Sequence, residues 1–297
     1  MANTTFSPKI FSKELLRKFD QKNVFMEYAN RDYTWELKKH WDSVHVQIAP
    51  DLTFTASAIS NAWAADFKTG TGPGWVITAE DFVITAENLI INKYTEKRIQ
   101  ISNFEMVQSN IDLESMIADR AAVWLKNLMD NEFRDQVLVT DIANIPAENK
   151  LYSGAPKSDV SKTTIYGYIE EMRVALENQN VTENLVLFLS PLFGSYLIQS
   201  GLLDASDVWL EDRKRGFIGL LGWVAVKTTP SLTASWEMIM MQDKTVNFVT
   251  QIVDTDVVKA TDGLYWNLMF QVVWGGKIFT PSGKWISVFY TSQGTES

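Results

Sequence analysis

The residues best placed to bind a phosphate group are the three glycines Gly216, Gly219 and Gly222. A phosphate loop needs a G-x-G-x-x-G run, or a glycine followed by Lys and Ser or Thr, so that backbone N–H groups cradle the anion. Neither pattern is present, and apolar side chains fill the gaps between these glycines. The spacing therefore predicts a turn and a tight strand crossing rather than a nucleotide site.

Acidic residues are the next candidates, because paired carboxylates can bind a divalent cation. Asp254 and Asp256 form an Asp-x-Asp motif, and adjacent acidic pairs occur at 80–81, 170–171 and 211–212. Adjacent side chains point in different directions, and the glycine and terminal glutamate of a calcium-binding loop are missing. We interpret these residues as solvent-exposed and predict no metal.

Thiol chemistry is excluded because the chain has no Cys, and a His-rich metal centre is excluded because it has only His40 and His45. His45 follows Val44 in an alternating stretch, so we expect it on the face opposite the valines, without a nucleophile beside it. The sequence predicts no catalytic residue and no cofactor.

Two tryptophans lie at a glycine-rich loop, residues 60–74, one within the loop and one directly after it. Trp63 and Trp75 suit either a sugar-binding platform or anchors that press into a neighbouring subunit, and we favour the anchors. The candidate inter-subunit contact residues are Phe11, Phe19, Trp63, Phe67, Lys68 and Trp75.

Composition indicates a globular protein that does not use a positively charged surface to bind nucleic acid. The 297 residues are 46% hydrophobic and 21% charged, with a net charge of −9. Phosphate binding depends on Lys and Arg, so this acidic balance argues against a DNA-binding surface. No basic leader and no apolar run of about 20 residues is present, so we expect synthesis in the cytoplasm and no membrane partner.

The N-terminal part combines a short helix with a long β-arm. Residues 12–20 form an amphipathic stretch too short to stand alone, which must lie on its own chain or on a neighbour. Period-two alternation from 42 to 103, including the run 89–101, predicts strands. An isolated two-stranded arm is marginally stable, so packing against another surface is expected.

A long helix follows, at residues 109–137. Ala118, Ala121, Leu125 and Leu128 lie on its predicted buried face, with Asp130 largely on the polar side. At 1.5 Å per residue it would span about 40 Å. Such a helix is either a structural spine or an ordinary long amphipathic core helix.

The residue pattern from 163 to 201 predicts an α/β unit. A helix at 163–179 precedes the buried strand 185–189, and Ser190 with Pro191 begins a helix that should end at Gly201. The remainder, 246–252 and 270–290, is strand-like, with turns expected at 275–276 and 281–283.

Several stretches occur in the order known for one protein family: 11–19, 30–33, 42–48, 89–104, 184–191, 205–206, 216–226, 228–230 and 274–281. In this order they resemble the major capsid proteins of tailed bacteriophages, whose fold is named after phage Hong Kong 97. The resemblance implies an α+β chain with an N-terminal arm (1–41), an extended β-loop and returning strand (42–103), a peripheral domain with a spine helix (104–162), an axial α/β domain (163–235), and closing strands (236–297).

The family also implies a function. The subunit would assemble with copies of itself into hexamers and pentamers of an icosahedral shell that encloses double-stranded DNA without sequence-specific binding. The resemblance allows scaffold, portal and decoration proteins as further partners, and implies the virion as the location.

Three other functions stay open. An encapsulin-like nanocompartment subunit would enclose an enzyme cargo, and a tail or baseplate protein would form tubes or rings. A hydrolase-like or carbohydrate-active enzyme would use Trp63 or Trp75 as a platform and paired carboxylates for acid/base chemistry.

Overall fold

The computed structural model describes residues 15, 17–18, 24–34, 42–48, 85–102, 113–152, 160–203, 216–232, 238–259 and 265–290. The chain forms two compact units, one of residues 45–88 and one of residues 1–44 with 89–297. Helices and sheets are both prominent, so the predicted α+β class is confirmed.

β1 (Ser43–Ile48) and β2 (Thr85–Ile90) pair as a two-stranded sheet. Val44 and Val46 are half-buried whereas His45 is exposed, so the predicted alternation is confirmed. The strands expected between residues 49 and 84 lie outside the described residues. The predicted run 89–101 is divided between β2 and the next strand, β3.

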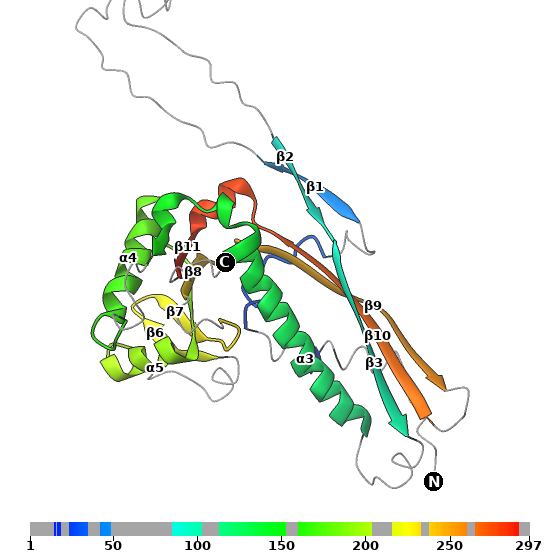
Figure 1. Ribbon diagram of the computed structural model, residues 1–297. Coiled ribbons are helices and arrows are strands. Elements are labelled where there is room, and N and C mark those ends of the chain that lie inside the picture. Colours follow the sequence, from blue (N-terminus) through cyan, green and yellow to red (C-terminus); the bar gives the residue numbers. More distant parts are fainter. Residues whose placement is uncertain are drawn as a thin grey trace, which may run out of the picture. The chain divides into compact units, whose positions relative to one another are not determined.

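A three-stranded antiparallel sheet carries the spine helix on one face (Figure 1). Its strands, in spatial order, are β3 (Lys93–Ser102), β10 (Tyr265–Lys277) and β9 (Asn247–Lys259). α3 (Leu113–Asp135) packs Trp124 edge-on against Phe270 of β10, with ring centroids 5.9 Å apart. The aromatic contact places α3 along the middle strand.

The predicted buried face of the spine helix is largely confirmed. Ala118, Ala121 and Leu125 are buried and Leu128 is half-buried. The expectation for Asp130 was wrong, because its side chain is fully buried. After Asp135 the helix continues as a π-helical turn, Gln136–Thr140, followed by 3₁₀ turns at Ile142–Asn144 and Ala147–Asn149.

A six-stranded sheet forms the second half of the larger unit. Its spatial order is β4 (Lys150–Tyr152), β11 (Ile286–Tyr290), β8 (Met238–Gln242), β5 (Leu185–Leu189), β7 (Val224–Thr228) and β6 (Phe217–Leu221). Strands β4, β8 and β11 therefore come from outside residues 163–235.

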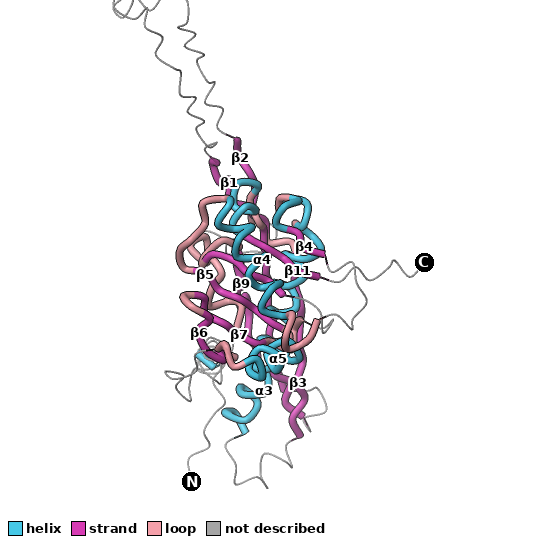
Figure 2. Tube along the Cα trace, turned by 90° about the vertical axis from the view of Figure 1, so that its left-hand side faces the viewer, coloured by secondary structure: helices cyan, strands magenta, loops and turns pink. Residues whose placement is uncertain are grey.

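Helices α4 (Ile165–Asn178) and α5 (Pro191–Ser200) cover one face of this sheet, the side seen in Figure 2. Along β5, Leu185, Leu187 and Leu189 pack against these helices. Val186 and Phe188 point to the opposite face and join the core around α3. Both faces of β5 are therefore buried, which explains its continuous apolar sequence.

The local signals of this region are confirmed. The predicted stripe of α4, formed by Ile165, Ile169, Met172 and Leu176, is buried. The Ser190 hydroxyl accepts a hydrogen bond from the Phe193 N–H at 3.4 Å, so Ser190 caps α5.

Two glycines with positive φ mark the end of a helix and the turn of a hairpin. Gly201 ends α5 with φ 71°, as predicted. Gly222 turns the β6–β7 hairpin with φ 62°, which confirms a turn in the 216–222 segment.

The turn predicted at Gly275 and Gly276 was wrong, because both residues lie inside β10. Their small size serves packing: a Cβ on Gly275 would lie 2.1 Å from the carbonyl oxygen of Ile90, the last residue of β2. The turn predicted around Pro281 is confirmed as the 3₁₀ helix Thr280–Trp285.

Candidate assembly elements

The six contact residues predicted from the sequence all lie outside the described residues. They are Phe11, Phe19, Trp63, Phe67, Lys68 and Trp75. Their role as contacts between subunits stays a prediction. The described residues show a different feature, which the sequence patterns had not indicated.

That feature is the segment 24–34, here called the strap, which joins the spine helix to both sheets. Phe25 is fully buried, stacked on Phe133 of α3 with ring centroids 4.9 Å apart. On its other side Phe25 lies 4.6 Å from the ring of Phe188 in β5. Burying one such aromatic side chain contributes about 1.5–3 kcal/mol, so this contact couples α3 strongly to the six-stranded sheet.

Backbone hydrogen bonds extend the strap to the start of β9. The Lys244 N–H donates to the Tyr28 carbonyl at 2.9 Å, and the Phe248 N–H donates to the Asn30 carbonyl at 3.1 Å. The side-chain amide of Asn30 donates to the Oδ1 atom of Asn247 at 2.9 Å. The strap thus contacts the three-stranded sheet as well.

An ion pair between a buried lysine and an exposed glutamate links the strap to β7. The Lys227 side chain is 4% exposed, and its Nζ atom lies 2.6 Å from the Glu27 carboxylate, which is 36% exposed. The same ammonium group lies 4.6 Å from the centre of the Tyr28 ring. A buried lysine is costly unless paired, so Glu27 and Tyr28 compensate for the burial of this charge.

A buried carboxylate links the strap to α3. The Oδ1 atom of Asp130 accepts a hydrogen bond from the Phe25 N–H at 3.3 Å, and its Oδ2 atom lies 3.2 Å from Lys126 Nζ. Burial raises the pKa of the Asp130 carboxyl above its usual value, and the Lys126 charge opposes this shift. Asp130 faces inward because the strap lies on that side of the helix.

The chain before the strap also contacts α3. Leu15, Arg17 and Lys18 are helical, within the amphipathic stretch predicted at 12–20. Leu15 is fully buried in the core, and Lys18 forms an ion pair with Asp119 of α3 at 3.2 Å. The sequence left open whether this stretch packs on its own chain or on a neighbour, and these residues pack on their own chain.

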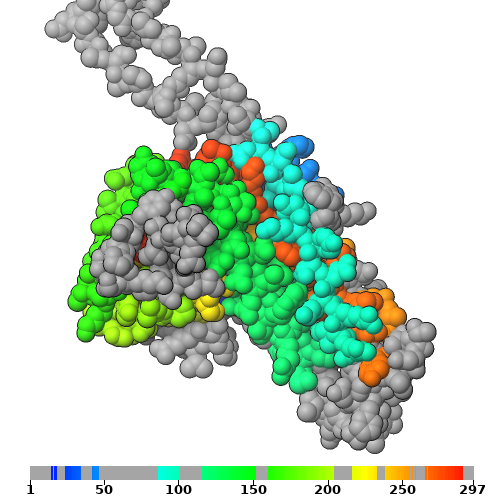
Figure 3. All heavy atoms as spheres, in the orientation of Figure 1, coloured from blue at the N-terminus to red at the C-terminus, as the bar shows by residue number. Residues whose placement is uncertain are grey.

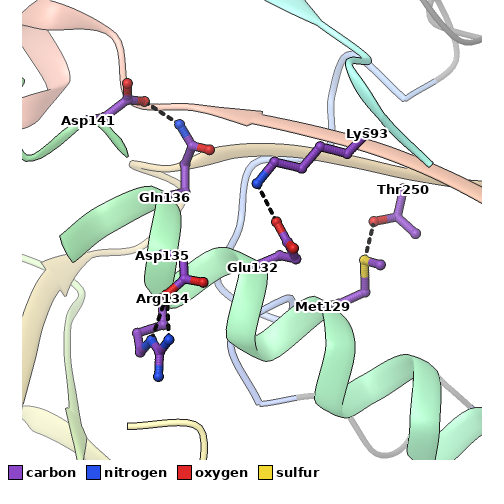
Figure 4. Close-up of polar contacts among 8 residues, drawn as sticks. All are labelled: Lys93, Met129, Glu132, Arg134, Asp135, Gln136, Asp141 and Thr250. Carbon is purple, nitrogen blue, oxygen red and sulfur yellow. Dashed lines mark hydrogen bonds and ion pairs between the residues drawn. The ribbon is translucent and has the colours of Figure 1, made fainter. Parts of the chain in front are cut away.

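Polar contacts fix α3 to the strands beside it (Figure 4). Lys93 of β3 forms an ion pair with Glu132. The Thr250 hydroxyl of β9 donates to the sulfur of Met129 at 3.2 Å. Because one contact reaches each outer strand, the helix is held across the width of the sheet.

The end of the spine helix contacts the link from β10 to β11. The Gln136 side-chain amide donates to an Asp141 carboxylate oxygen at 2.7 Å, and the Ile278 N–H donates to the same oxygen at 2.6 Å. The Asn144 amide donates to the Ile278 carbonyl at 2.7 Å. Asp141 is therefore a shared acceptor where the two sheets meet.

The residues first considered for chemistry are dispersed. His45 and Asp256 are exposed on β1 and β9. Among the described residues, no group of three or more His, Asp or Glu side chains is arranged to hold a metal ion. Within the same ranges, no helix has the length and apolar character needed to cross a bilayer.

The fold of this chain is similar to that of several solved structures. No protein-family model matches the sequence, and no curated protein matches it significantly. A solved structure from Mycobacterium phage Che8 is 20% identical, with 90% of each chain covered and a TM-score of 0.64. The capsid structure of cyanophage P-SCSP1u is 10% identical over 91% of this chain and 89% of the other, also with a TM-score of 0.64.

A virus-like particle from Pyrococcus furiosus is similar as well, at 14% identity over 95% of this chain and 98% of the other, with a TM-score of 0.55. Each of these three comparisons covers at least 90% of this chain. The chain therefore has the Hong Kong 97-like major capsid fold.

Proposed function

We propose that this chain is the major capsid protein of a tailed double-stranded DNA phage, a non-enzymatic subunit of an icosahedral shell. The observation that carries the proposal is the agreement in fold over 90% of both chains with the structure from phage Che8. Hexamers and pentamers of the subunit would tile the shell. The location would be the virion, after synthesis in the host cytoplasm.

The charge of the chain supports a container that does not bind its contents tightly. The net charge is −9, and non-specific DNA affinity depends on Lys and Arg that neutralise phosphates. An acidic subunit would leave the packaged DNA free to be released. This function allows scaffold, portal and decoration proteins as further partners.

The domain organisation belongs to the same proposal. Residues 1–41 would be the N-terminal arm, 42–103 the extended β-loop with its returning strand, 104–162 the peripheral domain, 163–235 the axial domain and 236–297 the closing strands. In the described part of the arm, the strap is built into the core of its own chain.

Assembly tests the proposal directly. Purified protein, with a scaffold protein supplied, should form closed particles tens of nanometres across or the capsomers that precede them, as seen by negative-stain microscopy and sedimentation velocity. A chain that stays monomeric under all these conditions would refute the proposal. Open tubes or rings would instead indicate a tail or baseplate protein.

A nanocompartment subunit is the second candidate, favoured by the similarity to the virus-like particle over 98% of that chain. Particles isolated from the producing cells would distinguish the two functions. A phage shell should protect DNA from added nuclease, whereas a compartment should contain an enzyme and no protected genome. Nuclease protection followed by mass spectrometry of the particle contents measures both.

The loop at 60–74 is proposed as a clasp between subunits, with Trp63, Phe67, Lys68 and Trp75 as its contacts and Phe11 and Phe19 as contacts of the arm. Deleting residues 60–74 should leave the circular-dichroism spectrum unchanged but lower the temperature at which particles dissociate. Particles as stable as the wild type would contradict a clasp.

A further inference from the structure

One edge of the three-stranded sheet has no neighbouring strand among the described residues. The sheet has the order β3–β10–β9, so β3 pairs with β10 on one side only. Along residues 95–100, every second residue therefore points its N–H and C=O groups away from β10. In Figure 3 the cyan segment that contains β3 lies uncovered beside α3 on the visible face. Such an edge is a template for an added strand.

The two edges of this sheet differ in regularity. β3 pairs with β10 in an unbroken register. The pairing of β9 with β10 instead shifts register between Gln271 and Val272, which leaves Val253 of β9 as the extra residue of a bulge. A bulge twists an edge strand and hinders the addition of another strand. β3 is therefore the edge better suited to accept one.

The edge at β3 is also basic. The strand contains three basic residues and one acidic residue, Glu96, whose carboxylate accepts a hydrogen bond from Gln271 at 3.4 Å. Of the basic residues, Lys93 is paired with Glu132 of α3. The other two, at positions 97 and 98, are exposed and form no ion pair within the described residues. β3 therefore presents two uncompensated positive charges.

These two charges leave the strand on opposite faces. Lys97 Nζ lies 5.5 Å from the centre of the Trp124 ring, on the side of α3. On the other face, Arg98 Nε donates a hydrogen bond to Asn267 Oδ1 at 2.9 Å. Because adjacent residues of a strand alternate between faces, a strand added to β3 would meet a positive charge on both of its own faces.

Charge and backbone geometry together identify the kind of partner. The chain has a net charge of −9, so a basic edge is an exception on its surface. An acidic extended segment would continue the backbone ladder and place carboxylates beside Lys97 and Arg98. DNA binds cations as well, but it has no row of N–H and C=O groups that could continue the ladder. A second copy of this sheet would offer the bulged edge of β9.

We propose that residues 95–100 are a docking strand for an acidic, extended segment of an accessory protein of the shell. This inference rests on the proposed function and assigns a site to one of the partners that this function allows. Binding to the isolated subunit tests it without any need for assembly, so it can fail while the proposed function stands.

Peptide binding to the purified full-length subunit tests the charge of the docking strand. The probes are two short fluorescent peptides, in which Val and Thr alternate with Glu in one and with Lys in the other. Fluorescence anisotropy should show at least tenfold tighter binding of the acidic peptide. An acidic peptide that binds no better than the basic one, or does not bind, would overturn the inference.

Charge reversal locates the contact. Lys97→Glu and Arg98→Glu should each weaken binding of the acidic peptide at least fivefold. Lys162→Glu is the matched control, because Lys162 is exposed directly before α4, outside the docking strand, and its reversal should change the affinity less than twofold. Equal weakening in all three variants would overturn the inference. Circular-dichroism melting curves verify that each variant folds.

Hydrogen exchange distinguishes strand addition from a contact of side chains alone. With the acidic peptide bound, amide exchange measured by mass spectrometry should slow at least tenfold along residues 95–100. Unchanged exchange there would overturn the inference. Two further results would also overturn it: the same protection in concentrated subunit without peptide would show that a second copy occupies the edge, and displacement of the peptide by a double-stranded oligonucleotide would show a nucleic-acid contact.

Discussion

The ring of Phe25 lies on the ring of Phe133, with centroids 4.9 Å apart and an interplanar angle of 14°. The two residues join the strap to the spine helix, and both are fully buried. Since the strap also contacts β5, β7 and β9, this pair lies where the helix and the two sheets meet. The stability of the subunit should therefore depend on it.

Replacing the strap's aromatic ring tests this dependence. Phe25→Ala should lower the free energy of unfolding by about 3–5 kcal/mol, because it removes buried area and leaves a cavity between α3 and β5. Urea denaturation followed by circular dichroism measures the change. Val139→Ala, at a side chain 67% exposed on the π-helical turn, is the control and should stay within about 0.5 kcal/mol of wild type. Equal losses in both variants would contradict a central role for Phe25.

The Glu27–Lys227 pair should respond differently to removal of each partner. Glu27→Ala leaves a nearly buried ammonium group without its carboxylate, so we expect a loss of about 1–3 kcal/mol, moderated because water reaches Glu27. Lys227→Met removes the buried charge and keeps the volume, and should cost less. Denaturation of both variants at neutral pH provides the comparison. A greater loss for Lys227→Met would show that the ion pair itself is strongly stabilising.

The buried Asp130 carboxyl should make stability depend on pH in an unusual direction. Its pKa in the folded chain is raised above the reference value of 3.8, so folding favours the protonated form. The stabilising contribution is present in full below pH 3.8 and is lost as pH rises through the folded-state pKa. We expect the stability of wild type relative to Asp130→Asn to decrease as pH rises above about 4. A difference that is constant or increases with pH would contradict this assignment.

Replacing Gly275 and Gly167 by alanine compares a crowded position with an open one. Gly275→Ala should destabilise the chain by about 1–3 kcal/mol, because its Cβ would meet the Ile90 carbonyl at 2.1 Å. At Gly167, in α4, nothing lies within 4 Å of an added Cβ. Gly167→Ala should therefore stabilise the chain by about 0.5–1 kcal/mol through helix propensity. Thermal unfolding of the two variants should shift in opposite directions, and a parallel shift would be inconsistent with the packing at Ile90.

Short-range patterns predicted residues 165–201 well. The apolar stripe of α4, the buried strand β5, the Ser190 cap and the Gly201 end all agree with the structure. Each depends on residues no more than a few positions apart, so the sequence contains the whole signal.

The misjudged positions involve partners far away in the chain. Gly275 and Gly276 have the composition of a turn, but the backbone at Ile90, the end of β2, leaves no space for a Cβ on Gly275. The helical pattern placed Asp130 on the polar face. It is buried instead, because the Phe25 N–H that donates to its carboxylate comes from a segment 105 residues earlier in the chain. The strap has no periodicity that could identify it, because its side chains meet several different elements rather than one face.

The sequence by itself determined the type of most elements, the absence of thiol chemistry and the charge-free segments 184–203 and 216–226. The tertiary structure decided which of those uncharged residues are exposed, and that residues 24–34 belong to the core rather than to a free arm. The physical reason is that helix and strand propensities act over a few residues, whereas burial depends on which distant segments pack together.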